Sequence, residues 1–254
     1  MLAAIKRWRR RRIVSRAPLD DALWRETLAG LPFLAGLSAV DRERLRETVI
    51  LFLHGKSIHG AAGLALDAGM QLMIAAQACI LVLNLDIDYY DGWVEVIVYP
   101  HEFVPTIEYT DEAGVVHTDS MPRAGEAWLQ GPLILSWDDV APAADGVNVV
   151  IHEFAHKLDM LNGDANGYPP LHQGMSRETW SEVFSTAYGD FCSRVDADED
   201  VAIDPYAAES PAEFFAVMSE VFFESPHMVL STYAGVYAQL RAFYRQDPAA
   251  RIPP

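Results

Sequence analysis

The feature that most constrains this chain is a run of residues 147–161 that contains His152-Glu-Phe-Ala-His156. Two histidines four residues apart lie on one face of a helix, so their imidazoles can bind one metal ion. The glutamate between them, Glu153, can accept a proton from a water bound to that metal. We therefore predict a zinc site on a helix, with His152 and His156 as two ligands and Glu153 as the general base.

The surrounding sequence supports a helix. Neither proline nor glycine interrupts residues 147–161, Asp145 is a suitable N-cap, and Asn162-Gly163 is typical of a helix end. The alternative is a buried helix that carries two ordinary histidines and a surface glutamate. With 8 histidines in 254 residues, a chance His-Glu-x-x-His is expected in roughly one or two chains in a hundred. We therefore favour the metal site.

A catalytic zinc usually has three protein ligands and one open position. Our candidate for the third ligand is Glu213, which lies 57 residues beyond His156 in a predicted helix capped by Ser210. Glu213 also fits the third helical position of a capping box, where its carboxylate would accept a backbone N–H instead. Glu209 and Glu220 are the alternative ligands.

Two further residues are candidates for supporting roles. Asp159 shares a helical face with the two histidines, and a carboxylate there can accept the remaining ring N–H of a zinc-bound histidine. Otherwise it is an ordinary aspartate at a helix C-terminus, which the helix dipole slightly disfavours. Tyr206 precedes Glu213 by seven residues, and its phenol can stabilise an oxyanion if Glu213 reaches the metal. Otherwise Tyr206 is a turn or packing residue.

Composition and charge limit the class of protein. The chain is 51% hydrophobic and carries a net charge of −17, which indicates a globular protein and argues against direct nucleic-acid binding. Two cysteines, Cys79 and Cys192, cannot form a disulfide framework and fit a reducing compartment. We therefore expect a cytoplasmic protein.

The charge is uneven along the chain. Residues 1–16 hold seven basic side chains and no acidic one, which leaves 12 of the 19 basic residues against all 36 acidic ones, a formal charge of −24. No apolar segment of signal-peptide type follows the basic run, because charged residues intervene at 20–26. We predict a solvated, poorly ordered basic arm over residues 1–18, with contact to an anionic membrane surface as the minor alternative.

An apolar stretch spans residues 68–85 without a charge, and its 18 residues approach the lower limit for a membrane span. Three polar side chains interrupt the stretch, aspartates flank it, and no basic residue anchors either end. We therefore predict no membrane span, but a buried helix over 63–78 followed by a buried strand over 80–85.

The remaining pattern predicts an α+β fold. Helices are expected over residues 19–31, 39–53, 176–192, 210–224 and 228–244, strands over 93–99 and 133–137, a hairpin over 106–118, and a loop over 54–60. Near residue 130 the content changes from mixed α/β to mainly helical. We predict an N-terminal α/β part over 19–130, packed on a zincin-like catalytic part over 131–254, with one compact domain as an open alternative.

The predicted strand over 133–137 lies just before the motif helix. In a zinc peptidase, a sheet edge beside the metal helix can pair with an extended peptide by β-augmentation. The alternative, that this is an ordinary sheet strand, is at least as well supported by the sequence.

Several stretches together resemble one family. They are His-Glu-Phe-Ala-His-Lys-Leu-Asp at 152–159, Asn-Gly-Asp at 162–164, Tyr-Ala-Ala-Glu-Ser-Pro-Ala-Glu-Phe-Phe-Ala-Val-Met-Ser-Glu at 206–220, Phe-Tyr-Arg-Gln-Asp-Pro at 243–248, and upstream Leu-Pro-Phe-Leu and Ala-Ala-Gln-Ala-Cys. From about residue 24 onward, the chain resembles the Mlc titration factor A family of cytoplasmic zinc metallopeptidases. The combination is far more specific than the zinc motif alone.

The resemblance implies a gluzincin, with a catalytic core similar to that of the anthrax lethal factor protease. It implies one catalytic zinc bound by His152, His156 and Glu213, with Glu153 as general base and Tyr206 as the phenol that stabilises the transition state. It also implies aminopeptidase-like cleavage of short peptides, and binding of the glucose repressor Mlc in the regulation of sugar uptake.

A second hypothesis is a regulatory protein that sequesters an Mlc-like repressor, with zinc structural or peptidase activity incidental. A structural zinc site is normally closed by four protein ligands. The chain offers three good ligands and no nearby cysteine, which favours catalysis.

Overall fold

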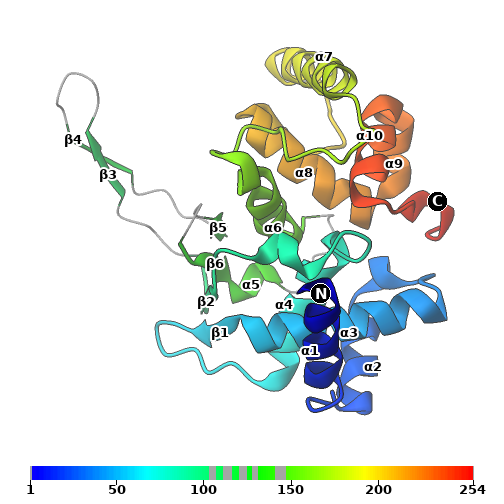
Figure 1. Cartoon of the computed structure of the whole chain (residues 1–254). Helices are drawn as coiled ribbons and strands as arrows, with labels where there is room; N and C mark the ends of the chain where they lie inside the picture. The colour runs from blue at the N-terminus through cyan, green and yellow to red at the C-terminus, as the bar shows by residue number, and fades with distance from the viewer. Residues whose placement is uncertain are drawn as a thin grey trace.

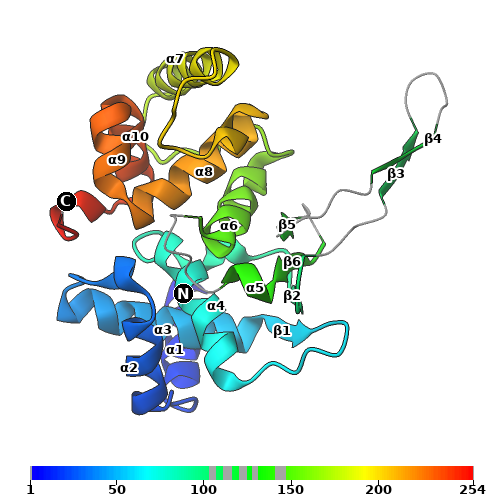
Figure 2. The ribbon, with the colours of Figure 1, turned by 180° about the vertical axis from the view of Figure 1, so that it is seen from behind.

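A computed structural model of the chain describes residues 2–102, 107–110, 116–119, 125–127, 131–140 and 147–253. In these residues a small sheet lies at one side of a mainly helical body (Figure 1), and the reverse view shows the same division (Figure 2). The predicted α+β class, a mixed helical and small-sheet part packed on a mainly helical part, is confirmed.

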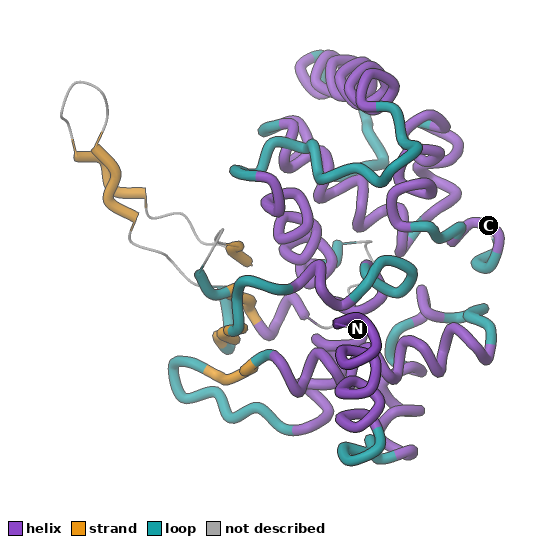
Figure 3. The backbone as a smooth tube through the Cα atoms, viewed as in Figure 1, coloured by secondary structure: helices purple, strands orange, loops and turns teal. Residues whose placement is uncertain are grey.

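Helices make up most of the described chain (Figure 3). They are α1 (Leu2–Val14), α2 (Asp21–Ala29), α3 (Ala39–Gly55), α4 (Ala68–Leu81), α5 (Trp137–Val140), α6 (Val149–Asp159), α7 (Arg177–Asp196), α8 (Pro211–Glu224), α9 (Pro226–Thr232) and α10 (Ala234–Tyr244). Short 3-10 helices join them, among them η2 (Ile87–Tyr90) and η4 (Pro205–Ala208).

The main sheet has the strand order β1-β2-β6-β5. Strands β1 (Ser57–Gly60), β2 (Glu95–Tyr99) and β6 (Leu133–Ser136) are parallel, and β5 (Gly125–Ala127) pairs antiparallel with β6. β2 precedes residue 130 and β6 follows it, so this sheet joins the two predicted parts of the chain. The division at residue 130 itself stays a prediction.

The predicted hairpin is confirmed in its strands. β3 (Ile107–Thr110) pairs antiparallel with β4 (Val116–Asp119), with Ile107 opposite Asp119. The predicted turn between them, residues 111–114, lies outside the described residues.

N-caps determine where the helices begin. Ser38, Ser176 and Ser210 each accept the backbone N–H three residues on, as the sequence predicts. The prediction for the motif helix is wrong, since α6 begins at Val149 and is capped by Asn148, whose side chain accepts the N–H of Ile151. The predicted cap, Asp145, lies outside the described residues.

The apolar stretch 68–85 contains no strand, which corrects the prediction for residues 80–85. Helix α4 continues to Leu81, and the chain then turns, with Leu83 N–H donating to Ile80 O and Leu85 N–H to Val82 O. Residues 74–83 are buried all round, and a continuous apolar run does not distinguish a buried helix from a buried strand. None of the helices in the described residues is long and apolar enough to cross a membrane.

Two other expectations also differ from the structure. The predicted loop over 54–60 contains strand β1, which is too short and too exposed to show an apolar alternation. The predicted single helix over 228–244 is two helices, α9 and α10, because Tyr233 between them has non-helical dihedrals of φ −133° and ψ 66°.

The basic segment at the start of the chain also differs from its prediction. Residues 2–14 form helix α1 rather than a poorly ordered arm. The ammonium group of Lys6 pairs with Asp88, and the guanidinium of Arg10 lies 2.8 Å from Asp86 and 2.5 Å from Asp88. These ion pairs hold α1 against the rest of the protein.

Candidate metal centre

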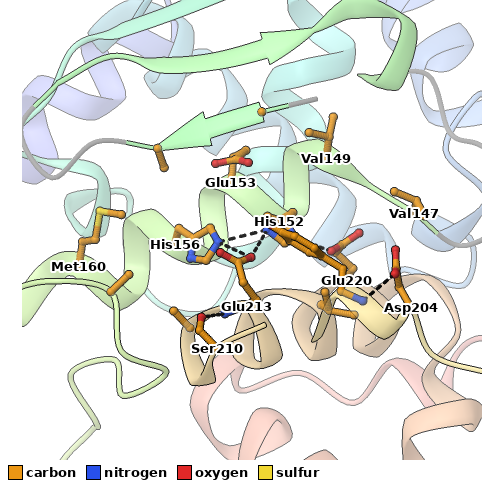
Figure 4. Close-up of a pocket in the computed structure, with 16 residues that line it drawn as sticks. Val147, Val149, His152, Glu153, His156, Met160, Asp204, Ser210, Glu213 and Glu220 are labelled. Carbon is orange, nitrogen blue, oxygen red and sulfur yellow. Dashed lines mark hydrogen bonds and ion pairs between the residues drawn. The ribbon is translucent and has the colours of Figure 1, made fainter. Parts of the chain in front are cut away.

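Helices α6 and α8 pack together and bring three metal-ligand atoms to one point (Figure 4). His152 Nε2 lies 2.9 Å from Glu213 Oε2, and His156 Nε2 lies 3.2 Å from the same oxygen. The two Nε2 atoms are 3.1 Å apart. Across the described part of the chain, this is the one group of three histidine, cysteine or acidic side chains found to be arranged for a metal ion.

The donor set fits zinc. Ligand atoms about 2.0–2.1 Å from a tetrahedral zinc lie roughly 3.3 Å from one another, and the three separations are within a few tenths of an ångström of that value. Two imidazole nitrogens and one carboxylate oxygen form a common catalytic zinc set. A single ion bound by all three atoms also explains why two imidazole nitrogens approach each other so closely.

The competing use of Glu213 in a capping box is not seen. Ser210 Oγ accepts the backbone N–H of Glu213 at 3.2 Å, so the serine alone caps α8. The Glu213 carboxylate points instead at the two imidazoles of α6 (Figure 4). The Ser210 cap uses only the backbone N–H of Glu213, so the Glu213 side chain remains available to bind a metal ion.

Glu220, an alternative ligand from the sequence, is not one of the three converging ligands but contacts one of them, His152. Its Oε1 is 2.6 Å from His152 Nδ1, and its Oε2 accepts the backbone N–H of Asn148 at 2.7 Å. A carboxylate on the second ring nitrogen fixes the histidine tautomer and leaves Nε2 free for the metal. The sequence assigned this kind of contact to Asp159, and only the two-turn spacing from Glu213 pointed to Glu220.

Asp159 is fully buried and hydrogen-bonds to a loop backbone rather than to a histidine. Its Oδ2 accepts the backbone N–H groups of Asn166 and Gly167 at 2.7 and 2.6 Å, and so holds the loop that follows α6. The other carboxylate oxygen, Oδ1, and His156 Nδ1 are both buried without a hydrogen-bond partner in the described residues. The expected hydrogen bond between Asp159 and His156 is therefore not formed.

Glu153 is 5% exposed, and its carboxylate lies against strand β5. A Cβ atom added at Gly125 would come within 2.5 Å of Glu153 Oε1 and Cγ, so only glycine allows the strand to approach so closely. Burial raises the pKa of Glu153, an effect that His152 and His156 partly oppose. A raised pKa is suited to a group that gains and loses a proton near neutral pH.

The pKa values of the metal ligands His152 and Glu213 depend on one another's charges. Burial works to lower the pKa of His152, but Glu220 and Glu213 outweigh it and hold that pKa well above its ordinary value. Burial works to raise the pKa of Glu213, but the two imidazoles outweigh it and hold that pKa well below its ordinary value. The site thus attracts a cation. A proton and a metal ion therefore compete for His152.

A cavity of about 560 Å³ opens over these residues. Gly125 and Ala127 of β5 line one side, and Tyr206 of η4 and Asp204, the N-cap of η4, line another. Tyr206 is 50% exposed, and its ring centroid lies 6.0 Å from that of His152. The structure therefore brings Tyr206 to the site that the sequence proposed for it.

The sheet edge beside the cavity is β5, which the sequence analysis missed. The strand predicted over 133–137 is β6, and it lies between β2 and β5 in the sheet. The prediction that it supplies a free edge is wrong, and the alternative of an ordinary sheet strand is confirmed. A three-residue strand such as β5 carries too little pattern to be found in the sequence.

We predict that metal affinity falls as the pH is lowered through the raised pKa of His152. The metal binds neutral imidazole, so each proton that it must displace costs about tenfold in affinity per pH unit. Competition with a chromogenic chelator between pH 5.5 and 8 measures this. His152→Ala should abolish binding, His59→Ala, which changes an exposed histidine in β1, should leave it intact, and a pH-independent affinity would refute the ligand assignment.

The comparisons with known proteins agree with this geometry. The sequence model described as glucose-regulated metallo-peptidase M90 matches residues 5–245. A protein named Mlc titration factor A from Salmonella arizonae is 37% identical over 252 residues, which is 96% of this chain and 98% of the relative. A protein of the same name from Salmonella gallinarum is 38% identical over 240 residues, covering 92% of this chain and 89% of the relative. The resemblance seen in the sequence is confirmed, and the chain belongs to the glucose-regulated metallo-peptidase M90 family.

Proposed function

We propose that this protein is a cytoplasmic zinc peptidase that hydrolyses short peptides. One observation carries the proposal. His152 Nε2, His156 Nε2 and Glu213 Oε2 converge in an open cavity, next to the buried carboxylate of Glu153. Three protein ligands with an accessible fourth side are the arrangement of a catalytic zinc rather than a structural one.

Each group has a distinct task in this mechanism. His152, His156 and Glu213 would hold a zinc ion, which would supply Lewis-acid polarisation of the scissile carbonyl and of the attacking water. Glu153 accepts a proton from that water and later gives it to the leaving amine. The Tyr206 phenol donates a hydrogen bond to the carbonyl oxygen as negative charge develops on it.

We predict that Glu153→Gln retains the metal and loses turnover by roughly 10²- to 10⁴-fold, because a general base contributes about that much. Hydrolysis of chromogenic amino-acid and short-peptide substrates, with metal content assayed on each preparation, measures this. The control is Glu209→Gln, which changes an exposed carboxylate outside the cavity and should keep both metal and turnover. Near-normal turnover in Glu153→Gln at equal metal content would exclude the mechanism.

We predict that a substitution in β5, the strand that covers Glu153, also lowers turnover. Gly125→Ala places a methyl group against the Glu153 carboxylate and displaces it, so kcat should fall about 10- to 100-fold with unchanged metal content. A displaced carboxylate is more solvated, so the acid limb of the pH profile should move to lower pH. Gly189→Ala in α7, where an added Cβ meets nothing within 4 Å, is the control. Unaltered kinetics in Gly125→Ala would show that this contact is not needed.

The cavity also suggests how a free amino terminus is recognised. Of the four carboxylates among its described lining residues, Glu153, Glu213 and Glu220 have the tasks given above. Asp204 remains, exposed beside Tyr206, with one oxygen accepting the backbone N–H of that tyrosine at 2.9 Å. We propose that the Asp204 carboxylate binds the cationic α-amine of the substrate, which makes the activity aminopeptidase-like.

We predict that Asp204→Asn raises KM for substrates with a free α-amine about two- to fivefold and leaves kcat nearly unchanged, because one exposed ion pair in uniform binding is lost. Peptides with an acetylated amino terminus should be unaffected. Asp164→Asn, which changes an exposed aspartate outside the cavity lining, is the control. An equal loss on free and acetylated substrates would refute this role.

A second function is favoured by the name of the relatives, Mlc titration factor A. We propose that this chain also binds an Mlc-like transcription repressor and so takes part in regulating sugar uptake. The same Glu153→Gln variant separates the two roles in a pull-down with a purified repressor. Repressor binding without turnover would show that the interaction does not need catalysis.

A further inference from the structure

Helix α1 lies at the surface against α3 (Figure 1) and has two unlike faces. The inward face carries Lys6, Arg10 and Ile13, spaced four and three residues apart. Lys6 and Arg10 pair with Asp88 and Asp86, and Arg10 and Ile13 are partly buried. These contacts fix the rotation of α1 about its axis, and therefore also fix which side chains point outward.

The outward face has an apolar centre. Ile5, Trp8 and Arg12 follow one another at spacings of three and four, so they share that face. Ile5 is 50% exposed and Trp8 is 59% exposed, and both are among the most exposed large apolar side chains of the described residues. The guanidinium carbon of Arg12 lies 5.4 Å from the centre of the Trp8 ring.

Cations surround this centre. Arg7, Arg9 and Arg11 are exposed, and within the described residues none of their guanidinium groups has an ion-pair partner. The fold therefore uses two of the basic residues of α1 and leaves the others facing solvent. An arginine-rich helix with tryptophan and an aliphatic residue on its exposed face is suited to the lipid headgroup region, where arginine binds phosphate and the apolar groups enter the interface.

We propose that the outward face of α1 docks the protein on an anionic membrane surface, with Trp8 and Ile5 in the headgroup region and Arg7, Arg9, Arg11 and Arg12 on lipid phosphates. The −24 formal charge of residues 17–254 opposes docking by other faces, and beyond about 10 Å its repulsion is screened by salt. This charge pattern directs α1, rather than the rest of the surface, toward the membrane.

Duplex nucleic acid fits the surface less well. Phosphate contacts would use the arginines, but they would leave the exposed Ile5 and Trp8 side chains in water. A lipid interface gives both kinds of side chain a favourable environment. With a single short helix and two apolar anchors, binding is expected to be reversible and sensitive to salt.

The test is co-sedimentation of the full chain with vesicles at about 100 mM salt. Vesicles of phosphatidylcholine with half phosphatidylglycerol are compared with vesicles of phosphatidylcholine alone. Three variants are run beside the wild type: Trp8→Ser, Arg9→Gln/Arg12→Gln, and the charge-matched control Arg25→Gln/Arg177→Gln, which changes exposed residues of α2 and α7. Thermal unfolding by circular dichroism verifies that each variant is folded.

We expect the wild type to bind the anionic vesicles only. Partitioning should be about tenfold weaker in Trp8→Ser and in Arg9→Gln/Arg12→Gln, and unchanged in the control Arg25→Gln/Arg177→Gln. Vesicle addition should also shift tryptophan emission to shorter wavelength in the wild type and less in Trp8→Ser. Absence of wild-type binding, or equal loss in the control, would overturn the proposal. So would tighter binding to duplex DNA than to vesicles at the same salt.

Discussion

The metal centre depends on buried hydrogen bonds that lock α6 against α8. Glu220 accepts from His152 Nδ1 at 2.6 Å and from the backbone N–H of Asn148 at 2.7 Å. The Asn148 amide donates in turn to Gln77 at 2.7 Å and to Glu224 at 2.6 Å, which ties in α4. Buried polar groups without such partners cost several kcal/mol, roughly 2–7 each. Any slip of one helix along the other would leave several of them unpaired, so the network selects the register that aligns the ligands.

A second set of contacts sets the distance between the sheet and the general base. Lys157 follows Glu153 by one helical turn, and its ammonium group donates to Gly131 O at 3.0 Å and lies 4.9 Å from the centre of the Trp93 ring. Burial and the nearby Lys56 lower the pKa of Lys157 to about 8. This lysine ties α6 to the chain just before β6, while Gly125 of β5 touches the Glu153 carboxylate. The Lys157 contact with Gly131 and the Gly125 contact with Glu153 thus fix the position of the general base relative to the sheet.

Local sequence signals predicted the parts of the molecule that local chemistry controls. Serine N-caps located the starts of α3, α7 and α8, and the spacing of His152 and His156 located two of the three converging donor atoms. Strands β1 and β5 were missed because a strand of three or four residues is defined by a partner far along the chain. The contact of Glu220 with His152 depends on helix packing, which no local pattern encodes. The same limit explains why Asp159 was assigned a contact that the structure gives to Glu220.

Glu213 shows how one position serves two needs that the sequence could not separate. A glutamate three residues after a capping serine normally returns to the helix start, yet here Ser210 satisfies the backbone and the carboxylate faces two imidazoles. The positive end of the α8 dipole and those imidazoles both favour its ionised form, consistent with the lowered pKa. The oxygen ligand is therefore ready for a cation even in mild acid. Protonation of His152, whose pKa is raised by Glu220 and Glu213, rather than of the Glu213 carboxylate, then sets the lower pH limit for holding the metal.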